Sequence, residues 1–175
     1  MFFTKRKAIL LFIICLIFFF LTYQDVKSSE ITSVTGYAKV TDGDTIKIDT
    51  FKIRLDGIDA PEKKQKCKRP YLTIFMFTFY EDYSCGQKST EALIKKINDQ
   101  KITCKIFDVD YFKRLIGECY KRKTNLNAWL VSNGHAVAFR KYSKKYVSQE
   151  LQAKENKKGM WQGKFEYPWD YRKKN

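Results

Sequence analysis

The sequence has very little histidine and no closely spaced cysteines. His135 is the one histidine among 175 residues, and none of the five cysteines belongs to a CxxC pair. These spacings fit no zinc site, because such sites are built from clustered Cys and His ligands. His135 also has no evident Ser or Cys partner for nucleophilic catalysis. Because it follows Gly134, at the expected end of a helix, we interpret His135 as a structural residue.

Acidic residues are scarce relative to basic ones. The chain has 34 Lys and Arg against 19 Asp and Glu, which gives a formal net charge of +15. Residues 1–28 hold four of these cations and one acid, a sum of +3, which leaves +12 for the remainder. Such a charge attracts polyanions, with nucleic acid the first candidate and an anionic lipid surface the second. A surface merely rich in lysine would carry the same charge, so composition alone does not decide the function.

Long repeats and long linkers are absent from the sequence, but a long apolar run stands near the N-terminus. This run, residues 8–21, follows the basic residues 5–7 and suits the hydrophobic region of a signal peptide, since it is short for a membrane span. Cleavage after Ser28 would remove it, whereas an uncleaved segment would anchor the chain in the membrane, and both interpretations stay open. In either case we expect residues 29–175 to be extracytoplasmic, whether periplasmic, secreted or anchored facing outside.

Four cysteines remain beyond the predicted export segment: Cys67, Cys85, Cys104 and Cys119. An even number in an exported chain predicts two disulfides, for which three connectivities are possible. We favour Cys67–Cys85 and Cys104–Cys119.

Periodicity indicates a small barrel with helices. Alternating apolar residues predict strands, and apolar stripes at helical spacing predict helices. The order of three strands, a helix, two strands and two helices is typical of a five-stranded OB-fold barrel, a mainly β fold with α (α+β) and about three helices. We expect strands near residues 32–41, 45–49, 51–55, 101–107 and 114–120, and helices near 87–98, 125–133 and 147–158.

In the expected strands 101–107 and 114–120, the Cys104–Cys119 disulfide and the strand register can be checked against each other. If Cys104 faces Cys119, Lys105 faces Glu118 and Phe107 faces Ile116. An opposite-charge pair and an apolar pair both result, which is the favourable outcome for facing residues of a hairpin.

Residues 63–84 form an insertion before the first helix. Its first part is basic, and its second part, Tyr71–Tyr80, is unusually aromatic and apolar. Two interpretations are open: a loop held by Cys67–Cys85 and packed on the barrel, or an aromatic flap that stacks on bases or touches a membrane.

Three carboxylates and two guanidiniums mark the candidate site: Asp44, Asp59, Glu62, Arg54 and Arg114. Carboxylates are preferred ligands of Ca²⁺ and Mg²⁺, and guanidiniums match phosphate. With the sequences DGDT and DAPE, and later NLNAWLVSNGHA and KGMW, the chain resembles the staphylococcal nuclease (thermonuclease) family over roughly residues 36–162. The resemblance implies a nuclease domain over residues 29–175.

The resemblance also implies a cofactor and residue roles. Asp44, Asp59 and the backbone carbonyl of Ala60 would bind Ca²⁺. Glu62 would order or activate the attacking water, and Arg54 and Arg114 would hold the phosphate. The expected substrates are DNA and RNA, in single-stranded or frayed regions, and no protein partner is implied.

The chain departs from the family pattern in two places. Lys113 stands where the family usually has Gly before Arg114, and Phe139 stands near a common Tyr position, where Tyr142 could substitute. A non-catalytic nucleic-acid-binding module is therefore the alternative function. A membrane-tethered structural protein that uses residues 71–80 as a contact is a third.

Overall fold

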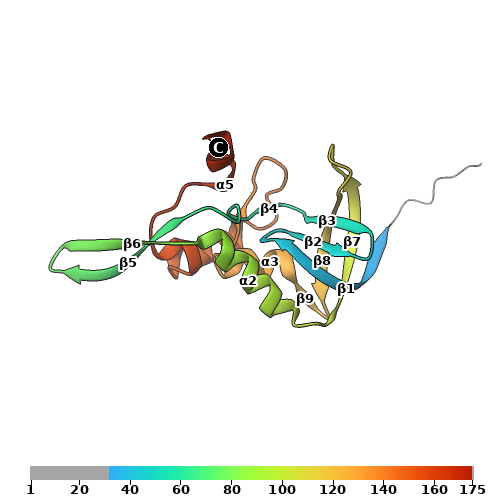
Figure 1. Ribbon diagram of the computed structural model, residues 1–175, viewed down its shortest axis with the longest axis horizontal. Helices are drawn as coiled ribbons and strands as arrows, with labels where there is room; N and C mark the ends of the chain where they lie inside the picture. Colours follow the sequence, from blue (N-terminus) through green and yellow to red (C-terminus); the bar gives the residue numbers. More distant parts are fainter. Residues whose placement is uncertain (1–31, 175) are drawn as a thin grey trace, which may run out of the picture. The chain divides into compact units, whose positions relative to one another are not determined.

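A closed β-barrel is the main sheet of the part of the chain that the structure describes (Figure 1). The computed structural model describes residues 32–174, so the predicted signal or anchor segment lies outside the described residues. The strand order is β3-β2-β1-β7-β8, and a parallel pairing of β3 with β8 closes the barrel. The predicted OB-type α+β fold is confirmed. The barrel strands are β1 (Ser33–Asp42), β2 (Thr45–Ile48), β3 (Phe51–Leu55), β7 (Lys101–Val109) and β8 (Leu115–Lys121).

Alternating apolar residues orient the strands that carry the site. Ile46 and Ile48 on β2, and Ile53 and Leu55 on β3, are buried in the main core, so the residues between them, including Arg54, face away from its centre. The β2–β3 turn has no glycine, and Asp49 takes the left-handed conformation there, with φ 51°. Asp tolerates this region better than most residues do, which explains a tight turn without glycine.

Helices cover the barrel close to the predicted ranges: α2 (Cys85–Ile97), α3 (Leu126–Ser132) and α4 (Val147–Glu155). The side chain of Asn125 caps α3 by accepting a hydrogen bond from the backbone N of Ala128, at 3.0 Å. The smaller elements are β4 (Ile58–Asp59), β9 (Thr124–Asn125), β10 (Val137–Ala138), the 3₁₀ helix η1 (Gly159–Gln162) and α5 (Pro168–Lys174). None of the described helices is both long and apolar enough to cross a membrane.

The β7–β8 hairpin confirms part of the predicted register. Cys104 faces Cys119, and the two form a disulfide. Phe107 does not face Ile116, because the register shifts between Ile106 and Asp108 and Ile116 lies opposite Asp108. The bulge adds one residue to β7, which leaves Phe107 exposed to solvent.

The Lys105–Glu118 pair keeps its place in the register but forms no ion pair. The carboxylate of Glu118 is buried and is paired with Lys145 instead. Lys105 is exposed, and its ammonium lies 5.7 Å from the centre of the Tyr120 ring. Glu118 is thus paired with Lys145, in the segment before α4, and not with Lys105, which lies opposite it in the hairpin.

The insertion at residues 63–84 forms a hairpin rather than a loop packed on the barrel. Its strands β5 (Cys67–Ile74) and β6 (Phe77–Tyr83) pair only with each other as a two-stranded sheet. The predicted Cys67–Cys85 disulfide holds the base of the hairpin at the start of α2. Beyond the base, the hairpin extends away from the barrel (Figure 1).

The C-terminal segment folds back onto the barrel through a second hydrophobic cluster. Trp169 stacks on Phe139 and on Tyr167, with ring centres 5.3 and 4.6 Å apart. Lys164 also exchanges two backbone hydrogen bonds with Lys68, at 2.7 and 3.0 Å. These contacts bring α5, an unpredicted helix, beside β4 and the loop that follows it.

Candidate active site

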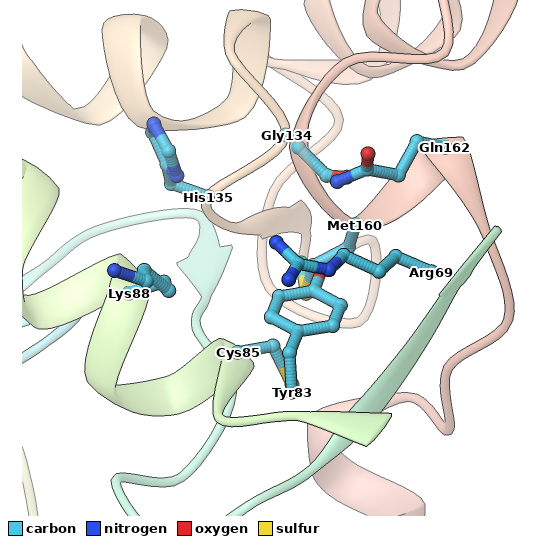
Figure 2. A pocket seen from close by; sticks show the side chains of 9 residues that line it. Arg69, Tyr83, Cys85, Lys88, Gly134, His135, Met160 and Gln162 are labelled. Atoms are coloured by element: carbon cyan, nitrogen blue, oxygen red, sulfur yellow. The ribbon is translucent and has the colours of Figure 1, made fainter. Parts of the chain in front are cut away.

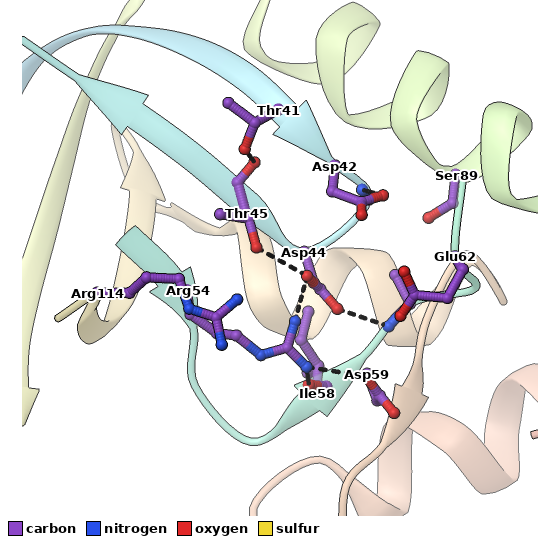
Figure 3. Close-up of polar contacts among 12 residues, drawn as sticks. Thr41, Asp42, Asp44, Thr45, Arg54, Ile58, Asp59, Glu62, Ser89 and Arg114 are labelled. Carbon is purple, nitrogen blue, oxygen red and sulfur yellow. Dashed lines mark hydrogen bonds and ion pairs between the residues drawn. The ribbon is translucent and has the colours of Figure 1, made fainter. Parts of the chain in front are cut away.

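Asp44 and Arg54 are brought together by the β1–β2 turn and by the pairing of β2 with β3. Thr45 lies opposite Arg54 in the ladder, so Asp44 stands at the end of the same pair of strands. An ion pair joins the Arg54 guanidinium to Asp44 Oδ1 (Figure 3). The backbone N of Leu55 also donates to the carbonyl of Asp44, at 2.9 Å. The local fold of β2 and β3 therefore fixes this first pair.

Asp59 joins the cluster from β4. The Arg54 Nη2 donates to Asp59 Oδ1 at 2.8 Å and to the backbone carbonyl of Ile58 at 3.3 Å. One guanidinium thus contacts the carboxylates of both Asp44 and Asp59, which are 4% and 0% exposed. The two carboxylates predicted to share a cation do lie on either side of a single positive group.

Two further hydrogen bonds orient the Asp44 carboxylate. Its Oδ2 accepts from the backbone N of Ala60 at 2.9 Å, and its Oδ1 accepts from the Thr45 hydroxyl at 3.0 Å. The bond to Ala60 ties the β1–β2 turn to the loop after β4. Ala60, the predicted carbonyl ligand, is therefore directly beside Asp44.

Arg172 on α5 is a member of this site that the sequence analysis missed. Its Nη1 and Nη2 donate to the two carboxylate oxygens of Asp59, at 3.1 and 2.7 Å. Its Nη1 also donates to Glu62 Oε1 at 2.7 Å. Glu62 is thereby linked to Asp59 through one guanidinium. The only sequence signal was the basic end of the chain, which has no motif that would distinguish Arg172 from its lysine neighbours.

The pKa directions reflect burial and the neighbouring charges. Burial raises the pKa of Asp59, and this outweighs the hydrogen bond from Arg172 and the charge of Arg54, which act to lower it. Burial acts to lower the pKa of Arg54, but the charges of Asp44 and Asp59 outweigh it and the pKa is raised. Burial also raises the pKa of Asp42, in the turn before Asp44. Asp59 therefore lies where charge is poorly solvated, beside two guanidiniums that act to lower its pKa.

Arg114 lies near the site but contacts a different carboxylate. Its Nε donates to Asp110 Oδ2 at 2.7 Å. The parallel pairing of Leu115 with Ile53 places the start of β8 beside β3, and in Figure 3 the Arg114 side chain extends toward Arg54. Lys113 has φ 60°, the left-handed conformation that suits a glycine, and here a lysine adopts it.

The donor chemistry of the site fits a hard cation. Asp44, Asp59 and the carbonyl of Ala60 offer oxygen atoms only, the ligand type that Ca²⁺ takes. Among the residues that the structure describes, no group of three or more His, Cys, Asp or Glu side chains is arranged to hold a metal ion. The protein side chains would thus supply part of a coordination shell, and Arg172 now contacts both oxygens of Asp59.

His135 and Phe139 lie in other surroundings. His135 lines a pocket with Lys88, Tyr83, Arg69 and Gln162 (Figure 2). Burial lowers the pKa of His135, and the pocket lining holds no acid, no serine and no free thiol, since Cys85 is in a disulfide. These surroundings agree with the interpretation of His135 as a structural residue.

The Phe139 ring packs against two other aromatic rings. It stacks on Trp169 and makes an edge contact with Tyr142, with ring centres 4.9 Å apart in the second case. Phe139 thus helps to hold the segment that carries Arg172.

Comparison with known proteins identifies the family. The family described as "Staphylococcal nuclease homologue" matches residues 52–163, more than half of the chain. The chain is 32% identical to "Succinoglycan biosynthesis protein ExoI" of Rhizobium meliloti (strain 1021), over 77% of this chain and 68% of that protein. It is 31% identical to a protein named "Uncharacterized endonuclease" of Escherichia coli O157:H7, over 77% of this chain and 83% of that one.

A plant relative is much longer. The chain is 32% identical to "Probable staphylococcal-like nuclease CAN3" of Oryza sativa subsp. japonica, over 70% of this chain but only 29% of the rice protein. The fold and the site define a small OB-barrel protein with a buried acid–arginine centre. The chain belongs to the staphylococcal nuclease family.

Proposed function

We propose that this protein is an exported, Ca²⁺-dependent nuclease that hydrolyses phosphodiester bonds of DNA and RNA. The observation that carries the proposal is the shared contact of Arg54 with Asp44 and Asp59 at one end of a staphylococcal-nuclease barrel. The relatives named as a nuclease and an endonuclease support the same class of reaction.

Each side chain has a role in this proposal. Asp44, Asp59 and the carbonyl of Ala60 would hold Ca²⁺, which when bound would polarise the phosphate and neutralise developing charge. Glu62, at the partly exposed side of the cluster, would orient the attacking water. Arg54 and Arg114 would bind the phosphate oxygens and stabilise their added charge in the transition state.

Export is part of the proposal because two independent features support it. Residues 1–28 have the composition of a signal peptide or signal anchor. The structure also has two disulfides, Cys67–Cys85 and Cys104–Cys119, and disulfides persist mainly outside the cytoplasm. We propose a periplasmic, secreted or outward-facing anchored protein.

Arg172 sets a condition on this function. Its guanidinium holds both oxygens of Asp59 and one of Glu62. A cation bound by Asp59 would compete with it, and Glu62 would be free to orient water only once Arg172 has moved. If Arg172 stays bound to Asp59 and Glu62, the site cannot take up the cation, and the alternative function, a nucleic-acid-binding module without catalysis, is favoured.

A cleavage assay separates the two functions. Residues 29–175 contain every described element and both disulfides, and should degrade single-stranded DNA and RNA with Ca²⁺ and stop when EGTA is added. Arg54→Ala should lower the rate by about 10³-fold or more, by analogy with arginines that stabilise phosphoryl-transfer transition states. Arg122→Gln, which removes an exposed guanidinium elsewhere, is the matched control and should keep the rate.

Two results would contradict the proposed function. Undiminished cleavage in EGTA would remove the metal from the mechanism. Binding of an oligonucleotide without any cleavage, with a steep salt dependence, would support the non-catalytic module instead.

A further inference from the structure

The β5–β6 hairpin carries an exposed apolar surface for which the active site has no use. From Pro70 to Tyr80 the sequence has no charged residue. At the turn, Phe75 and Met76 are 96% and 87% exposed. Contiguous exposed apolar surface of this kind marks an interaction site. The exposed large side chains are Tyr71, Leu72, Ile74, Phe75, Met76, Phe77 and Phe79.

The hairpin has one apolar face and one hydroxyl-bearing face. Leu72 lies opposite Phe79, and Ile74 lies opposite Phe77, so these four side chains share one face. Thr73 and Thr78 lie opposite each other on the other face, with their hydroxyls 3.3 Å apart. Together with the apolar turn, this makes the hairpin amphipathic along its length and apolar all round its tip.

Basic residues surround the base of the hairpin. Residues 63–69 hold five cations, and Lys164 is joined to this segment by its backbone bonds to Lys68. Asp82 and Glu81 pair with Lys68 and Arg69 respectively.

The remaining cations of the segment are open to solvent. Lys63, Lys64 and Lys66 are exposed, and they make no ion pair with any residue that the structure describes. Tyr80 lies at the boundary, with its ring centre 4.6 Å from the Lys164 ammonium. The base of the hairpin is therefore basic, Tyr80 lies at the boundary, and the turn at Phe75 and Met76 is apolar.

We propose that the β5–β6 hairpin binds an anionic lipid surface, with Phe75, Met76 and the apolar face in the lipid interface and the basic base at the headgroups. Aromatic and apolar side chains beside lysines are the composition of segments that lie in this interface. A strand advances about 3.3 Å per residue, so the three steps from Leu72 to Phe75 reach about 10 Å, the depth typical of interfacial segments. The outer edges of a two-stranded hairpin have unpaired backbone groups, which excludes deeper insertion.

The same features count against nucleic acid as the occupant. A base-stacking flap needs cations beside its aromatic rings to meet the phosphates. Residues 70–80 have none, and the nearest cations lie at the base of the hairpin. A second copy of this chain or another protein could cover an apolar face, but neither explains the exposed basic residues below an uncharged tip.

Vesicle flotation of residues 29–175 tests the proposal without the N-terminal apolar segment. This form should float with vesicles of phosphatidylcholine and phosphatidylserine, and bind weakly to phosphatidylcholine alone. The double variant Phe75→Ser/Met76→Ser should lose binding by about tenfold or more, since both side chains leave the lipid. The matched control Tyr111→Ser/Phe112→Ser removes two rings that are 95% and 74% exposed on another turn, and should still float.

The possible outcomes are distinct. Circular dichroism and intact disulfides would show that each variant is folded, which is expected because the changed side chains are 74–96% exposed. A wild-type protein that stays at the bottom of the gradient overturns the proposal, as does a tip variant that floats equally well. A dimer in sedimentation that the tip variant dissociates, without any vesicle binding, would identify a second copy as the occupant and would also overturn it.

Discussion

At the scale of single residues, the site is a balance of buried charge. Asp44 and Asp59 are almost fully buried, and Arg54 lies between them. Glu62 and Arg172 add one charge of each sign, so three carboxylates face two guanidiniums. Buried carboxylates are costly unless cations and hydrogen bonds compensate them. Without Arg172 the excess negative charge would be larger, and a divalent cation would suit the site better.

The Arg172→Gln variant tests this competition. It should bind Ca²⁺ about tenfold more tightly than the wild type, since charge-assisted hydrogen bonds to Asp59 and Glu62 no longer compete with the ion. Without Ca²⁺ it should also melt at a lower temperature, because Asp59 loses a partner. Calorimetric titration with Ca²⁺ and melting curves with and without the ion measure both effects.

Lys173→Gln is the control for this comparison. Lys173 lies on the same helix and is paired with Asp170, outside the acid–arginine cluster. It should bind Ca²⁺ as the wild type does. An unchanged affinity in Arg172→Gln would show that the Arg172 contact does not oppose ion binding.

At the scale of elements, a polar cluster links β8 to the segment before α4. The Tyr146 and Tyr120 hydroxyls donate to the buried Glu118 carboxylate, at 2.5 and 2.9 Å, and Lys145 pairs with it. Burial acts to raise the pKa of Glu118, but the hydrogen bonds from Lys145 and the tyrosines outweigh it and the pKa is lowered. Burial is also the main cause that raises the pKa of Tyr146. The cluster therefore stabilises the fold through an ionised carboxylate.

This lowered pKa predicts a pH dependence of stability. Because the folded pKa of Glu118 lies below the unfolded value, its contribution is present above about pH 4.5 and is lost as the pH falls through the folded pKa. The wild type should therefore lose more stability than Glu118→Gln between about pH 5 and pH 3. At neutral pH the variant should be less stable by about 1.5–3 kcal/mol, the value of hydrogen bonds to a charged group.

Chemical denaturation of both proteins across this pH range measures the difference. A constant difference in the free energy of unfolding would contradict the assignment to Glu118, whereas convergence at low pH would support it.

The elements also show where sequence patterns succeed. The alternation in residues 45–55 predicted β2 and β3, because one face of each strand is buried and the other is not. The bulge at Phe107 was not predictable from pairing rules alone, since nothing in the local sequence requires an extra residue in β7. α5 was missed because its position depends on aromatic stacking between Trp169 and Phe139, which are distant in the sequence.

At the scale of the whole molecule, much of the fold and part of the site could be predicted. The OB barrel, both disulfides and the convergence of Asp44, Arg54 and Asp59 followed from periodicity, cysteine spacing and family motifs. The contact of Arg172 could not, because it joins residues 110 and 113 positions apart through a tail that has no family motif. The projecting hairpin was open between two interpretations, since an apolar insertion is equally consistent with packing and with exposure.

The rate of the Glu62→Gln variant tests whether this acid–arginine cluster is a catalytic centre. Cleavage of single-stranded DNA with Ca²⁺ should fall by about 10²–10⁴-fold, the contribution typical of a general base, while binding of the oligonucleotide and the melting temperature stay close to the wild type. A variant that binds, folds and cleaves at nearly the wild-type rate would contradict the role proposed for Glu62, and Asp42, whose charge also acts on Asp44 and Arg54, would then be the next carboxylate to test.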